Sequence, residues 1–181
     1  RSCGAHRLLP PLMHLGEMRQ RAIIIVVSRC NGMSYTQAYY HIILRTHCSI
    51  PAIREEHERD LYSYILGYVN NIGGKLYRIG GMPDHVHLFV SLPADMSMSK
   101  FVQNLKISTS KWIKSNVLFP SFIGWSKEYA GFSYSLKDKE MIIGYISKQK
   151  EHHRIHSFAD EYRAFLQENG IQIREEYFLK D

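Results

Sequence analysis

The alternation of hydrophobic and polar positions predicts strands and helices over most of this 181-residue chain. Short segments rich in aromatic and β-branched residues indicate four strands, at residues 39–46, 75–80, 85–92 and 129–135. Longer segments, with hydrophobic residues three and four positions apart, predict four helices, at residues 53–70, 97–115, 137–151 and 158–168. The expected order is therefore strand, helix, strand, strand, helix, strand, followed by two more helices.

This order predicts an α+β fold with a ferredoxin-like β-α-β-β-α-β core. Such a core has an antiparallel sheet with helices on one face, and here a further helix is appended towards the C-terminus. Side chains alternate along a strand, so Val86, Leu88 and Val90 are expected to face the helices. His85 and His87 are then expected on the opposite, open face of the sheet.

Residues 1–32 have a different character from the remainder of the chain. They contain a Pro-Pro pair at positions 10 and 11 and show little periodicity, and they end at Asn31-Gly32, which is a turn signal. We interpret them as an N-terminal extension outside the catalytic fold, which leaves residues 33–181 as a single domain. A genuine extra helix or strand over residues 1–32 is the alternative.

Charge gives only weak evidence for a nucleic-acid partner. The net charge is +6, but residues 1–32 hold five arginines and one glutamate, so the other 149 residues carry only +2. Local clusters of basic residues must therefore support any such partner.

Hydropathy and cysteine content bear on where the protein works. With 45% hydrophobic residues the chain can form a substantial core, yet no apolar run approaches the length that a membrane span needs. The three cysteines have no metal-type spacing, and we interpret them as free thiols in a reducing cytoplasm.

Two groups of residues carry the candidate chemistry. His85 and His87 lie about 6–7 Å apart along one side of a strand, which makes half of a metal site. Asp84 beside them is a turn residue, a partner that orients a histidine, or an extra ligand. On the helix predicted over residues 137–151, Tyr145 and Gln149 are one turn apart.

A His-hydrophobic-His strand followed some 55–60 residues later by Tyr-x-x-x-Gln on a helix resembles the single-tyrosine HUH transposases. These IS200-like enzymes mobilise small insertion sequences as single-stranded DNA. The resemblance extends from about Met33 to Phe165 and includes the Ser-Tyr-Thr-Gln segment at residues 34–37. Each motif is common by itself, but their combination in this order is specific.

The resemblance implies a metal-dependent DNA strand transferase. His85, His87 and Gln149 would hold Mg²⁺ or Mn²⁺. Tyr145 would attack the DNA backbone and form a covalent 5′-phosphotyrosine, leaving a free 3′-hydroxyl. Because that bond stores the phosphoester energy, rejoining requires no nucleotide cofactor.

The implied partners are a single-stranded DNA that carries a hairpin and a second copy of the chain. In the homodimer, the Tyr145 helix of one subunit could complete the histidine site of the other. Basic residues on the helix predicted over residues 97–115 and in a second cluster around Tyr145 are the candidates for DNA contacts: Lys100, Lys106, Lys111, Lys114, Lys148 and Arg154.

Two other readings stay open. The chain could be a domesticated or inactive relative that works as a hairpin-binding or single-strand-binding module. Such a module would bind DNA without metal and would be unaffected by Tyr145→Phe. A replication or conjugation nickase of the wider superfamily would normally need a longer chain.

Overall fold

A computed structural model describes residues 37–155 and 157–181, so the extension predicted over residues 1–32 lies outside the described residues. Four strands form one sheet in the order β2-β3-β1-β4, and every neighbouring pair is antiparallel. The strands are β1 (Tyr39–Arg45), β2 (Lys75–Met82), β3 (His85–Ser91) and β4 (Ala130–Tyr134). This sheet and its helices confirm the predicted α+β fold.

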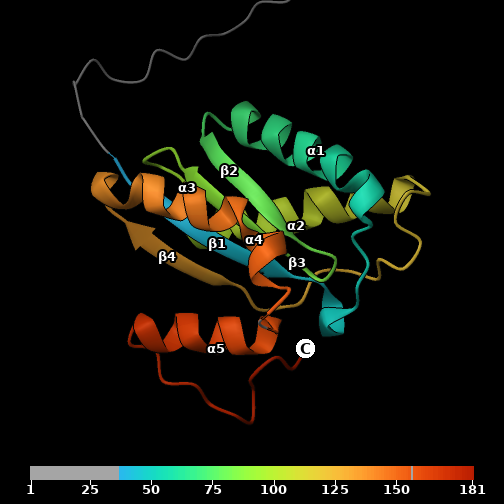
Figure 1. Cartoon of the computed structure of the whole chain (residues 1–181). Helices are drawn as coiled ribbons and strands as arrows, with labels where there is room; N and C mark the ends of the chain where they lie inside the picture. The colour runs from blue at the N-terminus through green and yellow to red at the C-terminus, as the bar shows by residue number, and fades with distance from the viewer. Residues whose placement is uncertain (1–36, 156) are drawn as a thin grey trace, which may run out of the picture. The chain divides into compact units, whose positions relative to one another are not determined.

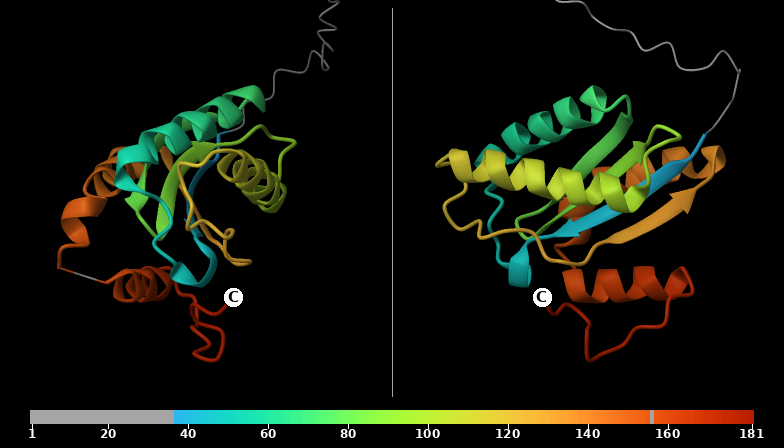
Figure 2. Two further views of the ribbon diagram at one scale, coloured as in Figure 1. Left: turned by 90° about the vertical axis from the view of Figure 1, so that its right-hand side faces the viewer. Right: turned by 180° about the vertical axis from the view of Figure 1, so that it is seen from behind.

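Helices α1 (Glu58–Asn71) and α2 (Met98–Ser115) cover one face of the sheet (Figures 1 and 2). Their apolar stripes pack against alternate residues of β3, which form the main core together with them. Helix α2 begins where the sequence predicted, because the Ser97 hydroxyl accepts a hydrogen bond from the backbone N–H of Lys100. The buried residues at this interface are Leu61, Ile65, Val69, Val86, Leu88, Val90, Phe101 and Leu105.

The second face of the sheet, which the sequence analysis expected to be open, is covered as well. Helices α3 (Lys139–Ser147), α4 (Gln149–His152) and α5 (Phe158–Glu168) pack there. The physical reason is that these helices have apolar residues of their own to bury. Ile142 and Ile146 of α3 pack with Tyr39 and Phe89, and Phe165 of α5 packs with strands β1 and β4.

The single helix predicted over residues 137–151 is wrong in one respect, because it is divided at Lys148. A short 3-10 turn, Leu136–Asp138, precedes α3, and Lys148 has φ −99° and ψ 10°, outside helical geometry. Its N–H donates to the carbonyl of Tyr145, three residues back, so the last turn of α3 tightens before α4 begins. Tyr145 and Gln149 therefore belong to different helices.

Two glycines on β2 allow the chain to approach itself closely beside the histidines. A Cβ on Gly80 would lie 2.8 Å from the carbonyl oxygen of Ile146 in α3. A Cβ on Gly81 would lie 2.2 Å from the carbonyl oxygen of His85. Both distances are shorter than real Cβ contacts, so Gly80 permits the close approach of α3 and Gly81 that of β3.

The other boundaries differ from the predicted ones by a few residues. Strand β2 extends two residues further than expected, to Met82, and α1 begins after a 3-10 turn at Glu55–His57. Helix α5 has the predicted bounds, and Gly170 beyond it adopts φ +71°. Among the described residues, no helix is both long and apolar enough to cross a membrane.

Candidate metal and nucleophile site

His85 and His87 project from β3 towards α3, α4 and α5, and both are fully buried. Their ring centroids are 5.0 Å apart, as expected for alternate residues of one strand. The Nδ1 atom of His85 lies 2.7 Å from Oδ1 of Asp84, which orients the ring. The Nε2 atom of His85 is buried and has no hydrogen-bond partner within the described part of the chain.

The ring of His87 is positioned by a third histidine that the sequence analysis did not single out. Nε2 of His41, on β1, lies 2.9 Å from Nδ1 of His87, and both rings are fully buried. Burial lowers the pKa of His41 to about 4 and holds the pKa of His87 well below its usual range. A neutral imidazole is the form that binds metal ions. The Nε2 atom of His87 also lacks a partner in the described ranges.

Tyr145 and Gln149 extend over these histidines from α3 and α4. The Tyr145 ring centroid is 6.0 Å from that of His87 and 5.9 Å from that of His41. Gln149 is 1% exposed, and its Nε2 donates to Oε1 of Glu161 over 2.9 Å. Its amide oxygen has no hydrogen-bond partner among the residues that the structure describes. The predicted residues therefore meet despite the break between the two helices.

Glu161 connects the elements of this site, and sequence reasoning missed it. It lies in the first turn of α5, where an acidic residue is ordinary helix chemistry, so no signal in the sequence distinguished it. Its carboxylate accepts hydrogen bonds from the Tyr145 hydroxyl and the Gln149 amide, and lies 2.7 Å from Nε2 of His153. Burial raises the pKa of Glu161, but these partners outweigh it and keep the carboxylate ionised.

The same contacts hold Tyr145 in its neutral form. Burial of the ring, and then the negative Glu161 carboxylate that accepts its proton in a hydrogen bond, raise the pKa of Tyr145 far above its usual value near 10. A neutral phenol is a weak nucleophile. Tyr145 is therefore beside the histidines but is not activated in this arrangement.

The donor set fits a divalent cation. Buried polar atoms in proteins nearly always have partners, so the three unpartnered atoms of His85, His87 and Gln149 need an explanation. Two imidazole nitrogens and an amide oxygen suit a borderline or hard divalent ion. A second set of ligand atoms, from His85, His153 and Glu161, lies with all members within 4.8 Å of one another. His85 belongs to both sets.

The predicted DNA-binding residues do not form one surface. Lys106, Lys111 and Lys114 line a groove of about 680 Å³ between α2 and residues 124–129. Lys100 is exposed near the beginning of α2 but does not line this groove, and Lys148 is exposed between α3 and α4. Arg154 lines a separate pocket that also contains the acidic residues Glu55 and Glu58.

Comparisons with known proteins place the chain in a family. Residues 34–149 match the family model described as IS200-like transposase. The fold is similar to the crystal structure of a candidate transposase from Deinococcus radiodurans R1, with a TM-score of 0.52 and 24% identity, covering 66% of this chain and 97% of that one. A REP-associated tyrosine transposase bound to a REP hairpin is matched with a TM-score of 0.46 and 14% identity, covering 66% of this chain and 73% of that one. No curated protein sequence matches the chain.

Proposed function

Because this chain belongs to the IS200-like transposase family, we propose that it cleaves and rejoins single-stranded DNA near hairpins, with Tyr145 as the nucleophile and a divalent ion as cofactor. The enzyme class follows from the family, whereas the assignment of residues rests on the geometry of this chain. The proposed ligands are His85, His87 and Gln149.

The observation that carries this proposal is that three buried polar atoms without a partner in the described chain belong to side chains gathered around one tyrosine and Glu161. The two Nε2 atoms and the amide oxygen come from β3 and α4, and Tyr145 reaches the same place from α3. Each second ring nitrogen is already held, by Asp84 and by His41. Orienting partners of this kind are what metal-ligating histidines have.

Mg²⁺ or Mn²⁺ bound by these residues would supply positive charge that stabilises the transferring phosphate group. The protein's own part is to keep the ligands oriented and shielded from water. His41 and Asp84 orient the two imidazoles, and Glu161 fixes the Gln149 amide so that its oxygen is left for a ligand bond.

Strand cleavage is a transfer from one oxygen to another. The phenolic oxygen of Tyr145 forms a bond to the scissile phosphorus, and the bond from that phosphorus to the 3′-oxygen of the preceding nucleotide breaks. The phenol loses its proton as the bond forms, and the leaving 3′-oxygen takes up a proton and becomes a hydroxyl, while the 5′-phosphate stays on the enzyme. Attack by another 3′-hydroxyl reverses these steps and rejoins the strand, so no nucleotide cofactor is needed.

Tyr145 must leave Glu161 before it can react. In this structure Tyr145 lies beside the histidines of its own chain, and its hydroxyl donates to the Glu161 carboxylate. We infer that this is a resting arrangement, and that binding of DNA and metal separates the two groups. A homodimer in which Tyr145 acts on the partner's site remains our expectation for the active form.

The test is a covalent-adduct assay on labelled single-stranded DNA from the flanks of the gene. We expect a protein–DNA adduct with Mn²⁺ or Mg²⁺ that survives denaturing electrophoresis, and that disappears with chelator or with Tyr145→Phe. Tyr134→Phe is the matched control and should leave the adduct unchanged. Tyr134 is also partly buried, and its ring centroid lies 6.4 Å from that of His41. Persistence of the adduct in Tyr145→Phe would refute the assignment. Tight, metal-independent hairpin binding with no adduct would instead favour a binding module.

A further inference from the structure

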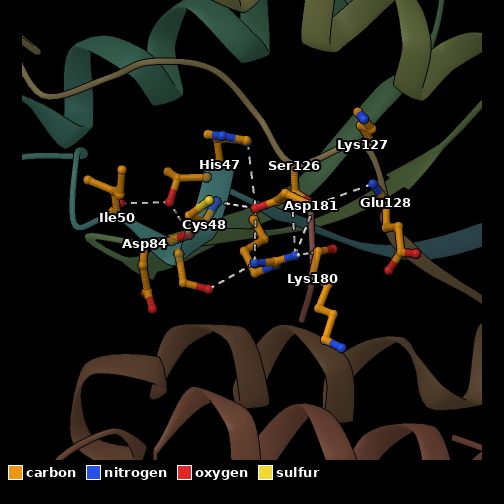
Figure 3. A network of polar contacts seen from close by, with 12 residues as sticks. His47, Cys48, Ile50, Asp84, Ser126, Lys127, Glu128, Lys180 and Asp181 are labelled. Carbon is orange, nitrogen blue, oxygen red and sulfur yellow. Dashed lines mark hydrogen bonds and ion pairs between the residues drawn. The ribbon is translucent and has the colours of Figure 1, made fainter. Parts of the chain in front are cut away.

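A second polar cluster, partly exposed, lies at the end of β1, around the carboxylate of Asp181 (Figure 3). Arg45, 6% exposed, contacts this carboxylate with both terminal nitrogens, Nη2 to Oδ1 at 3.3 Å and Nη1 to Oδ2 at 3.4 Å. The backbone N–H of Cys48 donates to Oδ2, and Nδ1 of His47 lies 3.6 Å from the same oxygen. The side chain of Asp181 is only 1% exposed. One carboxylate is therefore contacted from three nearby positions of the chain, 45, 47 and 48.

Ser126 completes the cluster and connects it to the sheet. Its backbone N–H donates to the carbonyl of Arg45 over 2.8 Å, and its hydroxyl accepts from Arg45 Nη2 over 3.1 Å. Burial raises the pKa of Asp181, but hydrogen bonds from Ser126 and the Cys48 N–H and the charge of Arg45 have a larger, opposite effect. The pKa is therefore lower than usual. The carboxylate is therefore held as an anion, and the cluster acts as an anion site.

The donors have the chemistry of a phosphate site. A guanidinium fork matches two oxygens of a phosphate as well as those of a carboxylate. Cys48 and Ser49 both adopt φ +53°, and the Cys48 N–H donates to the anion. Backbone N–H groups at turns of this kind form concavities that bind phosphates. His47, Cys48 and Asp181 also bring three ligand atoms within 4.8 Å of one another. A metal ion there is disfavoured, because the Arg45 guanidinium contacts the same carboxylate and would repel it.

This cluster is continuous with the groove that holds the candidate DNA-binding lysines. Ser126 and Lys106 both line that groove. The ammonium group of Lys106 donates to the carbonyl oxygens of Ser126 and Glu128, each over 2.8 Å, so its positive charge lies next to a residue of the cluster. Lys111 and Lys114 continue the positive charge along α2. A polyanion in the groove would thus reach the cluster without leaving positively charged surface.

We propose that Arg45, His47, the Cys48 N–H and Ser126 form a phosphate-binding pocket, here called the Arg45 pocket, for the backbone of single-stranded DNA. We further infer that the Asp181 carboxylate occupies this pocket as a competitor. That the anion is DNA rests on the proposed function, whereas binding of phosphate does not.

Displacement of Asp181 is physically reasonable because the segment before it is held by few buried contacts. Arg163 pairs with the exposed Glu175, and its guanidinium lies 4.4 Å from the ring centroid of Phe178. Exposed ion pairs contribute little to stability, typically below about 1 kcal/mol. Phe178 also stacks on Tyr162 at 5.9 Å. A phosphate would exchange with Asp181 while Arg45 stays paired throughout, which avoids leaving a buried charge without a partner.

The first test compares Asp181→Asn with Glu176→Gln on a hairpin-free oligothymidine of about 20 nucleotides. Both variants remove one carboxylate from the same segment, but Glu176 is exposed and lies outside the pocket. We expect Asp181→Asn to bind at least about fivefold more tightly than the wild type, with a salt dependence steeper by about 0.7 in log–log slope, as for one more phosphate contact. Glu176→Gln should stay within about twofold. Equal gains in both variants, or no gain in Asp181→Asn, would overturn the proposal.

The second test uses inorganic phosphate and requires no DNA chemistry. Phosphate should raise the melting temperature of Asp181→Asn more than that of wild type or Glu176→Gln, relative to chloride at equal ionic strength. If Asp181→Asn does not fold in chloride, phosphate should restore folding; failure to do so, or equal protection of all three proteins, contradicts the Arg45 pocket. A missing Tyr145 adduct would leave this result intact, so the two proposals fail separately.

Discussion

The two faces of strand β3 bury equal numbers of neighbouring side chains and yet treat them in opposite ways. Val86 and Leu88 are fully buried against α1 and α2, within the main apolar core. His85 and His87 are as deeply buried against α3, α4 and α5, where each ring keeps one nitrogen without a partner in the described chain. Burial alone therefore does not tell a structural residue from a functional one.

The difference lies in what burial contributes on each side. Removing apolar area from water stabilises the fold by roughly 25 cal/mol per Å². Burying a polar atom without a partner opposes folding by about 1–3 kcal/mol. Both faces thus gain stability from buried apolar residues, but on the face towards α3 the two histidines offset part of the gain that Phe89 makes there. Substitutions at adjacent positions of β3 should separate these two contributions.

The largest effect is expected from His87→Ala. Loss of one ligand nitrogen removes metal-derived stabilisation worth several kcal/mol, so adduct formation should fall by at least about a hundredfold. The free energy of unfolding should fall by less than in Leu88→Ala, because the cavity and the lost bond to His41 are partly offset by removal of a buried nitrogen that has no partner in the described chain. Single-turnover adduct kinetics and urea unfolding measure the two quantities. A large loss of stability with normal adduct formation per folded molecule would show that His87 is structural.

Leu88→Ala, one residue away, should give the opposite result. Leu88 is fully buried in the apolar core, so truncation should lower the free energy of unfolding by about 2–5 kcal/mol. Adduct formation by the protein that remains folded should stay within a few-fold of wild type, since the side chain points away from the histidines. Urea unfolding measures the free energy, and the same single-turnover assay measures adduct formation. If both variants lost activity and stability together, the two faces would not be separable.

Glu161→Gln should weaken metal binding rather than abolish it. Gln149 would lose the negatively charged acceptor that fixes its amide, and loss of an orienting partner typically reduces metal affinity about 10–100-fold. Titration of Mn²⁺ followed by electron paramagnetic resonance measures the affinity directly. Glu168→Gln, at an exposed position of the same helix, is the control and should bind Mn²⁺ as the wild type does. Unchanged affinity in Glu161→Gln would exclude an orienting role for Glu161.

The sequence predicted the sheet and the location of the histidines because both follow from local periodicity. Alternation on β3 assigned His85 and His87 to one face, and the helical spacing predicted α1, α2 and α5 within a few residues. The break at Lys148 depends on a hydrogen bond to Tyr145 that competes with regular helix geometry, and no proline or glycine marks it. Periodicity alone therefore could not locate it.

Glu161 and His41 escaped prediction for a related reason. Each reaches the site by tertiary packing, from α5 and from β1, and each resembles an ordinary residue in its own sequence context. The covering of the second sheet face could not be foreseen either, since the path of the chain after β4 is decided by long-range contacts such as that of Phe165 with Phe132. Sequence patterns thus located the ligands, while packing determined the residues that orient them.

The smallest expected effect is at the groove on the apolar side of the sheet, where Lys111→Ala should weaken binding of single-stranded DNA by less than about tenfold. Lys111 is exposed, so its loss removes one phosphate contact without disturbing the core. The slope of log affinity against log salt concentration should therefore become shallower by the equivalent of about one phosphate contact, and the loss of affinity should be the same for all DNA sequences. Lys137→Ala removes the same charge from an exposed position outside the groove and should leave both affinity and slope unchanged. Equal losses in the two variants would mean that general positive charge, and not the groove, attracts the DNA. A loss confined to Lys111→Ala would show that the face covered by α1 and α2 also contributes to substrate binding.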